Sequence, residues 1–184
     1  MASAAGSWAE VAVEPGWLTE DELASARDRV PILYVEAVPV RVGEDGSVEQ
    51  VGLLLRALPD GTISRALVAG RVRHGERLRA ALIRHIERDL GPLALPRLPV
   101  SPTPFAVVEY FPDPTVTGFH DPRQHAVSLA YVVPMAGECE PTSAALDLAW
   151  VTPEEASGDL AGELVGGQHR LLRMALAHMG HAGA

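Results

Sequence analysis

A long amphipathic helix bounded by glycines is the strongest structural signal in the sequence. Between residues 76 and 90, large aliphatic side chains recur at every fourth position, at Leu78, Leu82, Ile86 and Leu90. This spacing places them on one face of a helix, which is buried against the rest of the protein. The pair Gly91-Pro92 does not continue a helix and ends it. The sequence therefore predicts a loop over residues 69–75 and a helix over residues 76–90.

Extended segments lie on both sides of this helix and predict a sheet. Runs rich in valine, leucine and isoleucine predict strands over residues 32–42, 48–58, 63–68, 105–111, 124–133 and 146–151. Shorter helices are predicted after the capping box of Thr19 and Glu22, after Thr152, and over residues 168–179. This order is typical of an α/β (α+β) fold with a mixed sheet between helices. We expect an N-terminal extension with a short helix over residues 1–30 and one domain over residues 31–180.

Charge is distributed unevenly along the chain. The sequence has 15 basic residues, all of them arginine, against 24 acidic residues, which gives a net charge of −9. A chain without lysine has no Schiff-base chemistry and no phosphate-binding lysine, and the acidic balance argues against nucleic acid as a partner. Residues 56–97 nevertheless hold nine arginines and only four acidic residues, a local charge of +5. This basic segment is either a site for an anionic small molecule or a solvated helix face.

Cysteine content and apolar runs favour a cytoplasmic protein. Cys139 is the single cysteine, so no disulfide forms within the chain, and we expect its side chain to be inert packing. Residues 1–8 lack the basic start and apolar run of a secretory signal. The longest apolar stretch, residues 126–136, is too short to span a membrane. We therefore expect a cytoplasmic location and no membrane partner.

The segment from Gly70 to Gly91 also resembles the signature of the Nudix hydrolases. The glycines, glutamate, arginine and apolar residue of that signature are matched in spacing by Gly70, Glu76, Arg84, Ile86 and Gly91. The context is similar too, because a strand and a glycine loop precede the helix and further strands follow it. The resemblance covers residues 31–179. It implies a Nudix-like α/β/α sandwich with a mixed sheet, a divalent metal cofactor and cleavage of a diphosphate linkage.

The sequence departs from the family pattern where the family's glutamates bind metal. Those three positions hold His85, Arg88 and Asp89, so one carboxylate of the three remains. A fixed positive charge on Arg88 weakens metal binding if it lies close, but its guanidinium can also hold a phosphate directly. The alternative is a solvated Arg88 that points away from the site. The resemblance thus leaves open Mg²⁺ or Mn²⁺, Zn²⁺ or Fe with a nitrogen ligand, or no metal.

Candidate site residues come from this segment and from a second polar cluster, residues 118–125. By the resemblance, Glu76 and Arg84 form an orienting ion pair, and the candidate metal ligands are Glu76, His85 and Asp89. His85 and Asp89 lie four residues apart on one helix face, where the alternative is a neutral histidine hydrogen-bonded to the aspartate. The second cluster contains His120 and is either part of the site or a polar surface loop. The expected catalytic residues are Glu76, His85, Asp89 and His120, and the expected substrate-binding residues are Arg71, Arg73, Arg88 and Arg123.

Three functions remain open from the sequence. The first is hydrolysis of a diphosphate linkage in a nucleotide-derived or phosphorylated small molecule. The second is a module without catalysis that senses a ligand or binds a protein partner, which the loss of two metal carboxylates favours. The third is a non-hydrolytic enzyme, such as an isomerase, that uses the histidines. A phosphorylated small molecule is the expected partner, and a homodimer is an open option.

Overall fold

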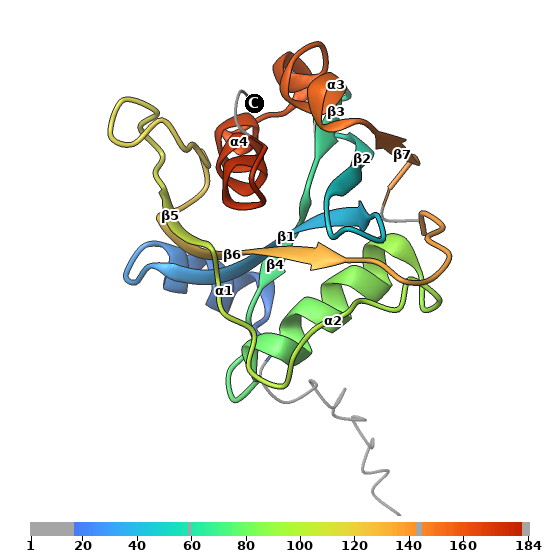
Figure 1. Cartoon of the computed structure of the whole chain (residues 1–184). Coiled ribbons are helices and arrows are strands. Elements are labelled where there is room, and N and C mark those ends of the chain that lie inside the picture. Colours follow the sequence, from blue (N-terminus) through green and yellow to red (C-terminus); the bar gives the residue numbers. More distant parts are fainter. Residues whose placement is uncertain (1–16, 59, 143–144, 182–184) are drawn as a thin grey trace, which may run out of the picture.

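The computed structural model describes residues 17–58, 60–142 and 145–181, which form one sheet with helices around it (Figure 1). No helix within these ranges is long and apolar enough to cross a membrane. In chain order the elements are α1 (Glu20–Arg27), β1 (Ile32–Val42), β2 (Val48–Ala57), β3 (Ile63–Ala66), β4 (Val68–Arg71), α2 (Leu78–Leu90), β5 (Ala106–Tyr110), β6 (Ala126–Pro134), β7 (Asp147–Val151), α3 (Pro153–Ser157), the 3-10 helix η1 (Ala161–Glu163) and α4 (Gln168–His178).

The strands form a mixed sheet, as predicted. Its main path runs β3-β2-β1-β6-β5, with β4 paired to β1 and β7 paired to β2. β1 and β6 run parallel over nine residue pairs, from Ile32 beside Ala126 to Val40 beside Pro134. The other pairings are antiparallel. β1 is therefore the central strand, since it pairs with β6 on one side and with both β2 and β4 on the other.

Helices cover both faces of this sheet and produce the predicted α/β/α layering. Figure 1 shows α2 on one side of β1 and β6 and α4 on the other. Alternation along β1 divides the apolar residues between two cores. Val35 and Ala37 belong to the core with the apolar face of α2, whereas Val38 and Val40 belong to the core with α4. Burial on both faces explains why β1 has the nearly continuous apolar sequence from which it was predicted.

One carboxylate of β1, that of Glu36, is buried and ties the sheet to α4. It accepts hydrogen bonds from the Tyr110 hydroxyl at 2.9 and 3.1 Å and from the Gln168 side-chain amide at 3.0 Å. Burial, which these hydrogen bonds oppose, raises the pKa of Glu36. The side chain of Gln168 also accepts a hydrogen bond from the backbone N–H of Leu67 at 3.0 Å. The start of α4 is therefore fixed to β1, to β5 and to the segment between β3 and β4.

The single strand predicted over residues 63–68 is wrong, and so is the start of the loop predicted over residues 69–75. The structure has two short strands, β3 paired with β2 and β4 paired with β1, and Leu67 lies between them. The apolar pattern does not tell which strand a segment pairs with, so it did not reveal this change of partner. As a result, Gly70 lies within the sheet, opposite Val35 of β1, and not in a loop.

The helix α2 begins at Leu78, two residues later than predicted. Arg77 is the N-cap and has extended backbone angles, with φ −73° and ψ 144°. The side chain of Glu76 accepts a hydrogen bond from the backbone N–H of Arg73 at 2.9 Å, which keeps Glu76 in the preceding turn. The helix ends at Gly91, whose φ of 84° favours glycine, as predicted.

Candidate functional site

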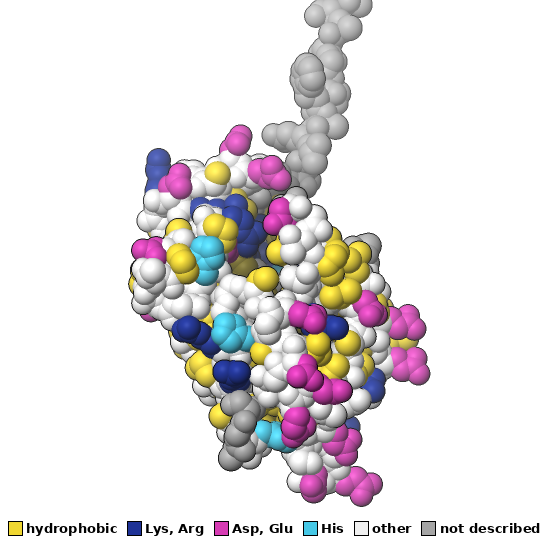
Figure 2. All heavy atoms as spheres, turned by 90° about the horizontal axis from the view of Figure 1, so that it is seen from above, with side chains coloured by type: hydrophobic (Ala, Val, Ile, Leu, Met, Phe, Trp, Pro, Cys, Tyr) yellow, Lys and Arg dark blue, Asp and Glu magenta, His cyan; other side chains and the backbone are white. Residues whose placement is uncertain are grey.

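A pocket rich in arginine lies where β1, β4 and α2 meet. It has a volume of about 330 Å³ and is lined by Trp17, Tyr34, Arg56, Ala69, Gly70, Arg71, His85, Arg88 and Arg123. Four of these described lining residues are arginines and none is acidic. On the face drawn in Figure 2, arginine side chains gather around a hollow, while many acidic side chains lie along the opposite side. Part of the basic segment therefore lines a concave site, which is where small molecules bind in most proteins.

His85 lies against the backbone of Gly70 in the wall of this pocket. A Cβ on Gly70 would lie 1.9 Å from Cε1 of the imidazole, so only glycine leaves room for the ring. His85 Nε2 lies 2.9 Å from the carbonyl oxygen of Arg71, which makes Nε2 the protonated nitrogen. Burial lowers the pKa of His85 to about 4, so the ring is neutral at physiological pH. The expected alternative of a hydrogen bond to Asp89 is wrong, because the ring donates to Arg71 instead.

Asp89 is fully buried behind the pocket wall and is held by two arginines. Its Oδ1 accepts from Arg88 Nε at 2.7 Å, and its Oδ2 accepts from Arg88 Nη2 at 2.9 Å and from Arg56 Nη2 at 2.5 Å. Arg88 Nη2 also donates to the carbonyl oxygen of Ala69 at 3.0 Å. Arg88 is therefore not a solvated residue that points away, since it spans from α2 to β4 and lines the pocket.

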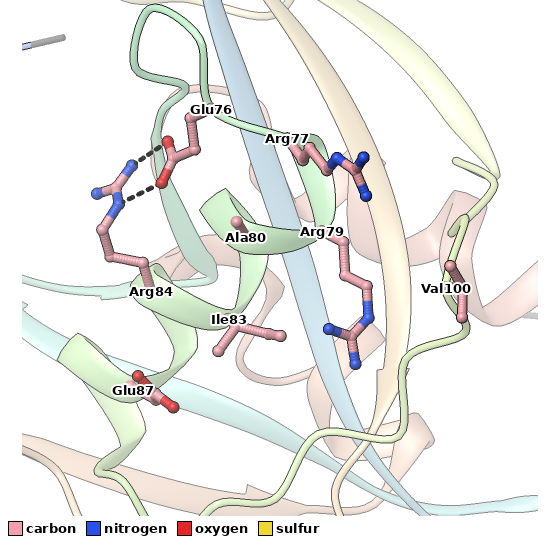
Figure 3. A pocket seen from close by; sticks show the side chains of 8 residues that line it. All are labelled: Glu76, Arg77, Arg79, Ala80, Ile83, Arg84, Glu87 and Val100. Atoms are coloured by element: carbon pink, nitrogen blue, oxygen red, sulfur yellow. Dashed lines mark hydrogen bonds and ion pairs between the residues drawn. The ribbon is translucent and has the colours of Figure 1, made fainter. Parts of the chain in front are cut away.

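Glu76 and Arg84 form the ion pair that the family resemblance implied. Arg84 Nε and Nη2 each donate to the Glu76 carboxylate at 2.7 Å, and Nη2 also donates to the carbonyl oxygen of Arg71 at 3.0 Å. These hydrogen bonds, opposed by partial burial, lower the pKa of Glu76 to about 2. Figure 3 shows the pair at one end of a second, more open groove, whose wall includes Arg79 and Val100. Glu76 thus lines that groove and not the arginine-rich pocket.

Removal of the Glu76 charge is expected to destabilise the fold in a pH-dependent way. Glu76→Gln breaks a bidentate ion pair and should lower the free energy of unfolding by about 2 kcal/mol at neutral pH. Since the pKa of Glu76 is about 2 in the folded state and 4.5 in a free chain, this contribution is complete above pH 4.5 and disappears as the pH falls toward 2. Urea unfolding at several pH values measures both effects. Glu87→Gln, on the exposed face of the same helix, is the control, and equal stability of the two variants would contradict the prediction.

The loop after β5 contributes an arginine to the pocket but not its histidines. Arg123 lines the pocket and is oriented by Asp121, which accepts from Arg123 Nε and Nη2 at 2.9 Å each. The buried Gln124 donates to Asp121 at 2.7 Å and to the Tyr34 hydroxyl at 2.9 Å, which connects two lining residues. His120 lies elsewhere, since its Nε2 is 3.1 Å from the carbonyl oxygen of Pro112. The expectation that His120 joins His85 is therefore wrong.

The candidate metal ligands do not form a metal-binding cluster. Both oxygens of Asp89 already accept from arginines, Glu76 is engaged by Arg84 and faces the other groove, and His85 donates its Nε2 proton to a carbonyl. Within the ranges that the structure describes, no group of three or more histidine, cysteine, aspartate or glutamate side chains is arranged to hold a metal ion. The residues present thus do not fit the hard oxygen ligation that Mg²⁺ requires.

Three large side chains that line the pocket, those of Trp17, Tyr34 and Arg56, are not among the residues that the sequence predicts for the site. Trp17 precedes α1, Tyr34 lies on β1 and Arg56 lies on β2, so they are distant from the helix that drew attention to the site. One sequence feature could have indicated Arg56, because it begins the basic segment over residues 56–97. Trp17 and Tyr34 had none, since their approach to β4 depends on tertiary packing. Of the expected substrate-binding residues, Arg71, Arg88 and Arg123 line the pocket, whereas Arg73 lies beside it, with its guanidinium 4.6 Å from the ring of Trp17.

Comparison with known proteins supports a relationship over nearly the whole chain. A family model described as "Domain of unknown function (DUF4916)" matches residues 13–181. The chain belongs to this family. A solved structure of a possible asymmetric diadenosine tetraphosphate (Ap4A) hydrolase from Jonesia denitrificans is 57% identical to this DUF4916 protein, with a TM-score of 0.82. The match covers 85% of this chain and 99% of the other. A search of the curated proteins found no match.

More distant solved structures show that the DUF4916 fold is that of the Nudix hydrolases, as the sequence predicted. The Nudix domain of NrtR from Shewanella oneidensis, in complex with ADP ribose, is 17% identical, with a TM-score of 0.58 and coverage of 88% of this chain and 99% of the other. A bifunctional NMN adenylyltransferase/ADP ribose pyrophosphatase from Francisella tularensis, in complex with AMP and a Mn ion, is 14% identical, with a TM-score of 0.59. That match covers 88% of this chain and 48% of the other.

Proposed function

We propose that the arginine-rich pocket binds a phosphorylated, nucleotide-derived small molecule. The observation that carries this proposal is the convergence of Arg56, Arg71, Arg88 and Arg123 on one concavity of about 330 Å³. Among the described residues, two carboxylates contact these four guanidinium groups, Asp89 and Asp121. The pocket therefore keeps an excess of positive charge for an anion.

The arginines offer the donors that phosphate oxygens need. A guanidinium presents its N–H groups in a planar fork, which matches two oxygens of a phosphate. Arg71 has no carboxylate partner among the described residues, and partial burial lowers its pKa, so its charge is poorly solvated in the free protein. An anionic oxygen in the pocket would give this guanidinium the partner that it lacks.

The two aromatic lining residues are Trp17 and Tyr34, and Trp17 offers a surface for a planar ring. The guanidinium of Arg71 lies 5.0 Å from the ring centroid of Trp17, which holds the indole at the edge of the pocket. Trp17 is 43% exposed, so part of its ring remains accessible to a ligand. Because bases stack on aromatic side chains, a molecule with a nucleobase and phosphates fits this pocket better than an inorganic anion does.

Hydrolysis of a diphosphate linkage in such a ligand is the second candidate function. The 57% identity with a possible diadenosine tetraphosphate hydrolase favours it. His85 does not offer a general base to the pocket, since its Nε2 is already protonated and its Nδ1 is buried. The support for hydrolysis is therefore this identity. An isomerase that uses a pair of histidines has less support, since His120 lies away from the pocket.

Ligand-induced stabilisation with a product assay separates these functions. Thermal unfolding is measured with adenosine, ADP and diadenosine tetraphosphate, and products are analysed by chromatography with Mg²⁺, Mn²⁺ and Zn²⁺. We expect a hundredfold excess of ADP over its Kd to raise Tm by about 5 to 10 °C, with little effect of adenosine. Arg71→Gln and Arg123→Gln should weaken ADP binding by about tenfold or more, whereas Arg79→Gln in the second groove should not. Equal effects of adenosine and ADP would contradict phosphate recognition.

Tryptophan fluorescence tests the aromatic part of the site. If a nucleobase stacks on Trp17, titration with ADP quenches part of the emission, and Trp17→Phe abolishes that part. Trp150→Phe is the matched control, because Trp150 lies on β7 beside Arg41 and does not line the pocket. Quenching that survives in Trp17→Phe and disappears in Trp150→Phe would place the base elsewhere.

A further inference from the structure

We propose that Arg56 and Arg88, held together by Asp89, take the place of a divalent metal in this pocket, which therefore binds the free phosphate anion and not its magnesium complex. This inference rests on the proposed function, because it concerns the same pocket. It adds the chemical form of the ligand and the origin of the positive charge that the ligand meets.

Asp89 is the one residue at a metal-ligand position of the family signature that keeps a carboxylate. Its side chain is fully buried and accepts three hydrogen bonds from two guanidinium groups, over distances of 2.5 to 2.9 Å. A divalent cation bound to these oxygens would have to displace both arginines. Displaced or not, the two guanidinium groups would repel the cation at short range. Asp89 is therefore the counter-ion of two arginines and not a free ligand.

The other two candidate metal ligands, Glu76 and His85, are also engaged by protein groups. The Glu76 carboxylate accepts from Arg84 and from the backbone N–H of Arg73, and it faces the other groove. The Nε2 proton of His85 is donated to the Arg71 carbonyl, and Nδ1 is enclosed by protein. These donors do not offer two free lone pairs that converge at one point in the pocket. Magnesium prefers several oxygen ligands in octahedral geometry, which this arrangement does not provide.

Arg88 keeps a hydrogen-bond donor for a ligand, and Arg56 lies beside it in the pocket wall. Arg88 uses Nε and Nη2 on Asp89 and Ala69, and its Nη1 makes no hydrogen bond to any described residue. Its side chain is 42% exposed and lines the pocket, so Nη1 is accessible to a ligand. Arg56 also lines the pocket, with its Nη2 bonded to Asp89 and its Nε buried. With one carboxylate shared between two guanidinium groups, the cluster keeps a fixed charge of +1 that faces the pocket.

The cluster of Arg56, Arg88 and Asp89 is held in place by the elements that it joins. Asp89 and Arg88 both lie on α2, while Arg56 lies on β2, so the cluster joins the helix to the sheet. The Thr142 hydroxyl also donates to the backbone carbonyl of Arg88. A guanidinium fixed in this way needs no further ordering when an anion binds, and this preorganisation favours binding. The expected ligand is therefore a free diphosphate or polyphosphate chain.

The response of pyrophosphate binding to magnesium tests the inference on the unmodified protein. Calorimetric titration with inorganic pyrophosphate is done once with EDTA and once with excess Mg²⁺. Because Mg²⁺ sequesters pyrophosphate, a pocket that takes the free anion should show an apparent affinity about tenfold or more lower with Mg²⁺. A site that binds metal-bridged phosphate shows the opposite sign. Higher affinity with Mg²⁺, or no binding under either condition, would overturn this inference. Neither result would overturn the proposed function, which the ADP titration decides.

Two further measurements connect the result to the arginines. Electron paramagnetic resonance with Mn²⁺ should detect no bound metal on the protein alone, and a stoichiometric Mn²⁺ site lost in Asp89→Asn would contradict the inference. Arg88→Gln should weaken pyrophosphate binding in EDTA by about tenfold, while Arg79→Gln, the same change on the opposite face of α2, should leave it unchanged. If the two variants bind pyrophosphate equally, Arg88 does not hold the anion. Circular dichroism verifies that both variants are folded.

Discussion

Replacement of Gly70 by alanine is expected to lower the free energy of unfolding by about 3 kcal/mol and to abolish ligand binding. The added Cβ would lie 1.9 Å from Cε1 of His85 and 2.3 Å from each ring nitrogen. The ring cannot move away easily, because His85 is buried and its Nε2 is bonded to the Arg71 carbonyl. Either β4 or α2 must shift, and both form the pocket wall. Urea unfolding and ADP titration measure the two effects.

The identity of the clash can be verified with a second substitution. His85→Ala removes the ring, so Gly70→Ala should cost much less in the His85→Ala background than in the original chain. Gly162→Ala is the matched control, because a Cβ there meets no atom within 4 Å. Additive effects of Gly70→Ala and His85→Ala would show that the alanine acts through something other than the ring.

Replacement of Asp89 by alanine is expected to destabilise the protein even more, by about 3 to 5 kcal/mol. The substitution leaves the guanidinium groups of Arg56 and Arg88 close together without the carboxylate between them. The two guanidinium groups then repel each other and lose their buried acceptor, and the link between α2 and β2 is lost at the same time. Thermal and urea unfolding measure the effect.

Two variants make this prediction specific. Asp89→Asn keeps the shape and part of the hydrogen bonding, so its cost should lie between those of the original chain and Asp89→Ala. Glu87→Ala removes an acidic side chain from the exposed face of the same helix and should change stability by less than about 0.5 kcal/mol. If Asp89→Ala were as mild as Glu87→Ala, the buried cluster would not contribute to stability.

Local patterns in the sequence predicted most of the fold. The capping box predicted at Thr19 and the N-cap predicted at Thr152 are both formed, and the strand predicted over residues 32–42 has the bounds of β1. These features depend on residues close together in the chain, which is why they could be read without a structure. The break between β3 and β4 could not, because it depends on whether a segment pairs with β2 or with β1.

The pocket was predictable only in part, for the same reason. The spacing of the Nudix signature indicated the Glu76–Arg84 ion pair, and the basic segment indicated an anion site. The ion pair of Arg56 with Asp89 joins residues 33 positions apart, so no local pattern in the sequence predicts it. The approach of Trp17 to Arg71 is equally non-local. The sequence places His120 in a polar segment, as it does His85, but the loop turns the His120 ring toward the carbonyl of Pro112, which no local pattern predicts.

The two carboxylates that hold the pocket arginines have a consequence for selectivity. Asp89 and Asp121 compete with any incoming anion, since three of the four pocket arginines, Arg56, Arg88 and Arg123, already have a negative neighbour. A singly charged anion such as chloride gains little against that competition, whereas a ligand with several charges engages three or four arginines at once. We therefore expect the affinity of the site to rise steeply with the number of negative charges on the ligand. Small singly charged anions should bind weakly, and polyanions should bind well.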